Sequence, residues 1–149
     1  MAYPSNGEFN VLYPTRRRMA ALLKRIVDAE LADPEGTLVS SIRINAKITG
    51  FEKLEIQIVA AYYFIFLNNG AYLWNGGRIA PRDFVSQFTI ALDDAGITSE
   101  IYDQYLEWLL KEYPLLDAIK VAEKNQKLVY TFEALYAPPD FVQGFPLDV

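Results

Sequence analysis

The chain has 149 residues, a formal net charge of −5 and a pI near 4.7, and this length suits one domain with a single core. Apolar residues make up 52% and aromatic residues 14% of the chain, a composition that excludes a disordered protein. The acidity argues against a general nucleic-acid binder, because neutralising phosphates requires a basic surface.

The first 13 residues are rich in Pro, Ser, Asn and Gly, with aromatic residues at Tyr3, Phe9 and Tyr13. This composition predicts an extended N-terminal arm over residues 1–13 rather than a packed element. Arms of this kind become ordered by lying on a neighbouring subunit. We therefore count these three aromatic residues among the candidate subunit-interface residues.

A single domain is expected over residues 14–136, and it begins with a helix from near Pro14 to about Ala32. Apolar residues recur there at helical spacing. The same helix carries the basic run Arg16-Arg17-Arg18, with Lys24 and Arg25 one to two turns later. These side chains spread over more than one face, which favours a solvated helix start. The alternatives are an ion-pairing contact with an acidic partner and a local contact with packaged DNA.

Two β-strands are predicted next. Apolar and polar residues alternate from Thr37 to Thr49, Gly50 breaks the run, and a second alternation covers residues 54–59. This pattern predicts an antiparallel hairpin with one buried face, which helices or further strands must cover. A later aromatic and β-branched stretch at 128–136 predicts another strand of a central antiparallel sheet.

The segment from Ala60 to Leu67 has no clean period and fits either a continued strand or a short helix. We favour a helical turn that ends at Asn68-Asn69-Gly70, with Gly70 as its left-handed cap. Residues 71–79 have the composition of an exposed loop around Trp74. The indole is either an interface anchor or a side chain that folds back on the domain.

Several helices are expected after the loop. Pro81 is suited to the start of a helix through Asp94, a second helix is predicted for 98–113, and a short one for 115–124. Arg78 and Arg82 flank Pro81 and fit either local roles or ion pairs with a neighbouring subunit. Residues 137–149 are predicted to form an extended C-terminal arm, with Phe141 and Phe145 as candidate contacts. The fold class is therefore α+β with extended terminal arms.

No catalytic signature is present. The chain contains no cysteine and no histidine, which excludes disulfides, Cys/His zinc sites and triads based on imidazole. The carboxylate pairs Asp93-Asp94 and Glu100/Asp103 lie at predicted helix ends, where acidic residues are common, so we expect neither enzymatic activity nor a metal or other cofactor. We find no signal peptide and no membrane-spanning stretch, and expect a soluble, non-secreted protein.

One stretch of the chain carries a resemblance. Leu38-Val39-Ser40-Ser41-Ile42 opens the first predicted strand, an aromatic segment ends at Asn68-Asn69-Gly70, and Pro81-Arg82-Asp83-Phe84 enters a helix. The order and spacing from about Gly36 to Leu92 resemble the small head-tail joining proteins of long-tailed bacteriophages, also called tail-completion, neck or minor virion proteins. Asn68-Asn69 stand where that family has an acidic residue before the glycine.

The resemblance implies a non-enzymatic structural virion protein, with an α+β domain that forms a homo-oligomeric ring between the portal vertex and the tail. It is expected at the head-tail junction of the virion, assembled in the bacterial host cytoplasm. Its expected partners are neighbouring neck, portal, adaptor or tail-tube proteins, with at most passive contact with DNA in the channel and none with a membrane. A tail-terminator protein and a soluble phage-encoded binding or inhibitor protein are the alternatives.

Overall fold

The structure is a computed structural model that describes residues 8–31, 37–49, 53–72, 75–112, 127–135 and 145–146. Its elements, in chain order, are β1 (Phe9–Asn10), α1 (Tyr13–Glu30), α2 (Thr37–Ser41), β2 (Arg43–Thr49), β3 (Lys53–Ala60), α3 (Tyr63–Asn69), β4 (Ala71–Tyr72), β5 (Arg78–Ile79), α4 (Phe84–Asp94), α5 (Ile97–Glu112), β6 (Lys127–Ala134) and β7 (Phe145–Pro146). These elements form an α+β fold, as the sequence predicts.

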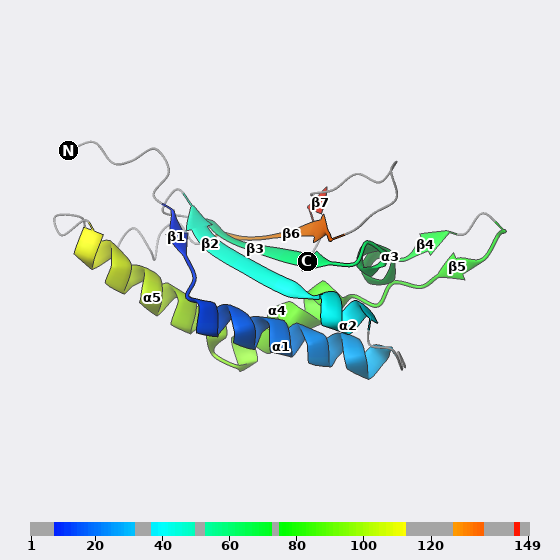
Figure 1. Ribbon diagram of the computed structural model, residues 1–149, viewed down its shortest axis with the longest axis horizontal. Helices are drawn as coiled ribbons and strands as arrows, with labels where there is room; N and C mark the ends of the chain where they lie inside the picture. Colours follow the sequence, from blue (N-terminus) through cyan, green and yellow to red (C-terminus); the bar gives the residue numbers. More distant parts are fainter. Residues whose placement is uncertain are drawn as a thin grey trace.

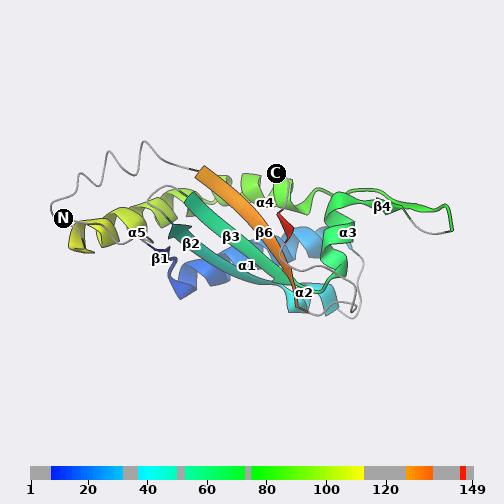
Figure 2. The ribbon, with the colours of Figure 1, turned by 90° about the horizontal axis from the view of Figure 1, so that it is seen from above.

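A five-stranded sheet of order β1-β2-β3-β6-β7 lies over a layer of helices. Figures 1 and 2 show α1, α4 and α5 on one side of the sheet. Alternation along the strands explains this arrangement. Ile44 pairs with Ile58, which pairs with Phe132, and all three side chains are buried on the side of the sheet that the helices cover. The opposite face is polar and carries a hydrogen-bonded row from Asn45 through Gln57 to Glu133, with distances of 3.1 and 2.7 Å.

The sheet is mixed, which corrects the prediction of a purely antiparallel sheet. β2 and β3 form the predicted antiparallel hairpin, but β6 pairs with β3 in parallel, in register from Lys53–Lys127 to Ala60–Ala134. The chain between β3 and β6 includes α3, α4 and α5, and a long connection of this kind returns the chain to the same end of the sheet. Alternation predicts which face of a strand is buried but carries no information about strand direction.

The first five residues of the predicted first strand are helical instead. Thr37–Ser41 forms α2, and the strand begins only at Arg43. Leu38 and Ser41 are both buried and three residues apart, a spacing that suits one helical turn. The Ser41 hydroxyl donates to the Leu38 carbonyl at 2.6 Å and accepts the Ala61 amide at 3.0 Å, so it joins α2 to the end of β3.

The described part of the N-terminal segment is packed on the chain's own sheet. Phe9 pairs with Ile48 across β1 and β2, and the Phe9 side chain is 7% exposed. Its ring lies against those of Tyr105 and Trp108 on α5, with centroid distances of 5.8 and 5.5 Å. Residues 8–11 are therefore part of the domain, and residues 1–7 of the predicted arm lie outside the described residues.

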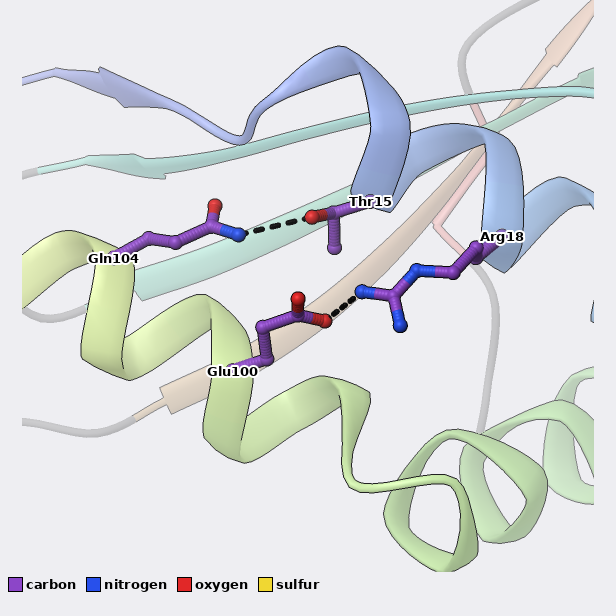
Figure 3. Close-up of polar contacts among 4 residues, drawn as sticks. All are labelled: Thr15, Arg18, Glu100 and Gln104. Carbon is purple, nitrogen blue, oxygen red and sulfur yellow. Dashed lines mark hydrogen bonds and ion pairs between the residues drawn. The ribbon is translucent and has the colours of Figure 1, made fainter.

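Polar contacts join α5 to the first turns of α1 (Figure 3). Thr15 is buried, and its hydroxyl oxygen accepts a hydrogen bond of 2.9 Å from the Gln104 amide. One turn later on α1 and one turn earlier on α5, Arg18 and Glu100 form an ion pair near the surface. The partly buried hydrogen bond fixes the register of the two helices, whereas an exposed pair of this kind contributes little to stability.

The predicted helices are otherwise confirmed to within a few residues, apart from α4, which begins at Phe84 rather than at Pro81. The predicted helix at 115–124 and nearly all of the C-terminal arm at 137–149 lie outside the described residues. Within the described ranges, no helix is long and apolar enough to cross a membrane.

Tyr130 provides a test of the core through pH. Burial raises the pKa of its phenol; the nearby Asp93 charge also raises it, and a hydrogen bond from Thr89 lowers it. The unfolded chain therefore releases this proton at lower pH than the folded chain. The Tyr130 contribution to the free energy of unfolding is complete below about pH 10 and is lost as the pH rises through the folded-state pKa.

We expect Tyr130→Phe to remove part of the alkaline loss of stability, measured by urea unfolding between about pH 8 and 11. Tyr72→Phe is the control. Because Tyr72 is 84% exposed, the burial argument does not apply to it, and this variant should keep the wild-type dependence of stability on pH. An unchanged profile in Tyr130→Phe would contradict the burial argument.

Candidate functional site

The most distinctive surface feature is a hairpin formed by β4 and β5. Ala71 pairs with Ile79, and Tyr72 pairs with Arg78. Figures 1 and 2 show this hairpin projecting from the junction of α3 and α4 beyond the end of the sheet. At its tip the Asn75 side chain accepts a hydrogen bond of 3.0 Å from the Gly77 amide, the geometry of a side-chain-stabilised turn.

The root of this hairpin requires a glycine. Gly70 has φ +79° and ψ 165°, so it ends α3 and turns the chain directly into an extended strand. A Cβ at this position would lie 2.9 Å from the carbonyl oxygen of Ile79 and 3.0 Å from Cδ of Pro81. Gly70 ends the helix with a positive φ, but its ψ of 165° is extended, so the predicted left-handed helical cap is wrong in ψ. The close approach of the returning strand is a second reason for glycine.

Asn68 connects the two ends of the hairpin. Its side chain is buried at 4% exposure, and its Oδ1 accepts the Val85 amide at 3.0 Å. That amide lies in the first turn of α4, where the N-cap residue Asp83 makes no side-chain capping bond and has a left-handed φ of 52°. Asn68 therefore caps α4 from the end of α3. Its Nδ2 also donates to Asn69 at 2.7 Å.

Backbone bonds complete the root. The carbonyls of Leu67 and Asn68 accept the amides of Arg82 and Asp83 at 3.0 and 3.3 Å. The Arg82 guanidinium donates to the Glu30 carbonyl at 3.1 Å and lies 3.9 Å from the Glu30 carboxylate, which ties the root to the end of α1. Hydrogen bonds thus hold the hairpin to three helices.

An aromatic stack supports the root from below. Phe84 is fully buried and stacks on Phe64 with a centroid distance of 5.8 Å, and Phe64 stacks on Phe132 of β6 at 5.5 Å. The stack joins α4, α3 and the sheet, so the hairpin base moves with the core rather than independently.

The hairpin itself presents an aromatic and cationic surface. The Tyr72 side chain is 84% exposed, and the Arg78 guanidinium lies 5.7 Å from the centre of its ring. This cation–π contact organises the two side chains without covering the ring. An exposed Tyr–Arg pair on a projection is the composition that protein–protein contacts favour.

The other predicted interface residues fall in different places. Tyr13 is 61% exposed at the start of α1, whereas Phe9 is buried within the domain. Tyr3, Trp74 and Phe141 lie outside the described residues. Phe145 belongs to β7, whose backbone pairs with β6. Arg82 has the local role described above.

In the part of the chain that the structure describes, no group of three or more Asp and Glu residues is placed to hold a metal ion. Of the carboxylates considered above, Asp93, Asp94 and Asp103 are exposed on helices, and Glu100 pairs with Arg18.

Sequence reasoning missed the hairpin and the capping role of Asn68. The composition of residues 71–79 predicts an exposed loop, although Asn75-Gly76 is a dipeptide typical of tight hairpin turns. Nothing in the local pattern indicates that Asn68 bonds a residue 17 positions away.

Comparison of this chain with protein-family models, with curated proteins and with solved structures finds no match.

We expect Gly70→Ala to lower the free energy of unfolding by about 2–3 kcal/mol, because a side chain is strained at this φ and ψ and its Cβ meets backbone atoms. Gly76→Ala is the matched control, since Gly76 also has positive φ (+88°) but an added Cβ meets no atom within 4 Å. It should cost about 1 kcal/mol. Equal losses in urea unfolding would contradict the close approach at the root.

Proposed function

We propose that the protein is a non-enzymatic structural protein of the bacteriophage neck, which assembles into a ring that joins the head to the tail. The observation that carries this proposal is the position of two of the three motifs on which the family resemblance rests. Asn68-Asn69-Gly70 and Pro81-Arg82-Asp83-Phe84 are separated by residues 71–80 and meet at one place, the root of the hairpin. There they orient a projection.

A projecting hairpin is suited to contact with another subunit. Two short strands are marginally stable in isolation, and the Tyr72 ring remains 84% exposed although the Arg78 guanidinium lies 5.7 Å from its centre. Packing against a neighbour would bury that ring and order the strands. Because the root already fixes the hairpin direction, little conformational freedom remains to be lost on assembly.

The lack of enzymatic activity is part of the same proposal. It is supported by the absence of cysteine and histidine from the chain, by the exposed helical positions of Asp93, Asp94 and Asp103, and by the ion pair of Glu100 with Arg18. A channel-facing surface of net negative charge would also allow DNA to pass with only passive contact.

The direct test is immunogold electron microscopy of purified particles of the source phage, with an epitope placed after Val149. Label at the head-tail joint is the expected result. Label at the end of the tail tube would instead favour a tail-terminator protein. Protein that remains in the soluble lysate, with unlabelled particles, would contradict a virion role and favour a binding or inhibitor protein.

A second prediction concerns the hairpin surface. We expect the double variant Tyr72→Ala/Arg78→Ala to fold with wild-type stability, within about 0.5 kcal/mol, because both side chains are exposed. In complementation of a phage that lacks this protein, it should lower the yield of infectious particles at least tenfold.

The control is Ile90→Ala, which removes another exposed apolar side chain (62%) from α4, away from the hairpin. It should leave the yield unchanged. Wild-type yield from the hairpin variant would show that this surface has no role in assembly.

A further inference from the structure

A basic groove lies between α1 and the edge of β2. Its volume is about 460 Å³, and its walls include Tyr13, Arg16, Arg17, Lys24, Arg43 and Asn45, with no acidic residue among the lining side chains. Four cations gathered in one groove are unexpected in a chain with a net charge of −5. None of these four forms an ion pair with another described residue.

The groove also offers an aromatic contact and a free strand edge. Tyr13 is 61% exposed, and the guanidinium groups of Arg16 and Arg17 lie 5.4 and 5.8 Å from its ring centre. β1 pairs only with Lys47 and Ile48, so within the described residues no strand covers the edge of β2 from Arg43 to Asn45. A partner in the groove would therefore meet positive charge, an aromatic ring and unpaired backbone.

The complementary surface is on α5 of the same chain. Asp103 and Glu107 are one turn apart on an exposed face, and the sheet and helices described make no ion pair with either. Leu110, less than one turn further along, is 55% exposed. This acidic row with an apolar neighbour has the opposite charge to the groove and a similar mixture of polar and apolar groups.

We propose that the Asp103–Leu110 face of α5 in one copy of the chain docks into the basic groove of a second copy. The two surfaces are different, so the contact is head-to-tail and can repeat from copy to copy until a ring closes. The inference deepens the proposed function, on which its ring context rests, by naming the two surfaces that meet.

A second copy fits the groove better than nucleic acid does. DNA would experience the repulsion of the whole acidic chain, whereas another copy brings its own unpaired carboxylates to the unpaired cations. Charge pairs at a partly exposed contact are screened by salt, so the association should weaken as ionic strength rises.

Charge exchange tests this contact. The groove variant Arg17→Glu/Arg43→Glu and the helix variant Asp103→Lys/Glu107→Lys each place like charges together in a self-contact. By sedimentation velocity at low salt, wild-type protein should self-associate, and each variant alone should show a dissociation constant raised about tenfold or more. An equimolar mixture of the two variants should recover association, because each supplies the charge that the other has lost.

The controls are Arg25→Glu on α1 and Asp94→Lys on α4, two exposed charges outside both surfaces, and both should associate like wild type. A wild-type protein that stays monomeric, a mixture that does not recover, or controls that lose as much would each overturn the proposal. So would duplex DNA that binds the wild type and not the groove variant, with self-association unchanged in that variant.

The two proposals fail separately. Particles labelled at the neck, together with a monomer in solution, would overturn this contact and leave the neck assignment standing. Unlabelled particles, together with intact charge-dependent self-association, would overturn the neck assignment and leave this contact standing.

Discussion

The hairpin and its root depend on the hydrogen bonds of one buried side chain, that of Asn68. It accepts the Val85 amide at the start of α4, while the Leu67 and Asn68 carbonyls accept the amides of Arg82 and Asp83. Loss of the buried bond between Asn68 and Val85 would leave polar groups in the interior without partners, at a cost of about 1–3 kcal/mol. The chain between Gly70 and Pro81 must therefore leave and return at one point, and that requirement makes it a projection.

The same constraint connects the hairpin to the sheet. Phe84 follows the root directly and stacks on Phe64, which stacks on Phe132 in β6. Core packing thus resists rotation of the hairpin base, and the exposed Tyr72 and Arg78 side chains keep a defined direction. A contact surface held in this way loses little freedom when it binds, which suits a protein whose proposed role is geometric.

Much of the architecture follows from sequence periodicity, and what does not has identifiable causes. Helical spacing predicted α1, α4 and α5 within a few residues, and alternation predicted the β2–β3 hairpin. The parallel pairing of β6 depends on a long crossover that no local pattern records. Alternation also predicts a strand over Thr37–Ser41, which is helical in the structure. The burial of Leu38 and Ser41 suits a helical turn as well as a strand. The root escaped prediction because its bonds join residues distant in sequence.

The central claim is that the root aims the hairpin at a neighbouring subunit. A cryo-electron microscopy reconstruction of the head-tail junction in the source particle tests it most directly. The account predicts a ring in which the hairpin from Ala71 to Ile79 leaves each domain in the direction seen in Figure 1 and packs Tyr72 against an adjacent chain. A ring in which the hairpins point into solvent, or a junction that lacks this protein, would contradict it.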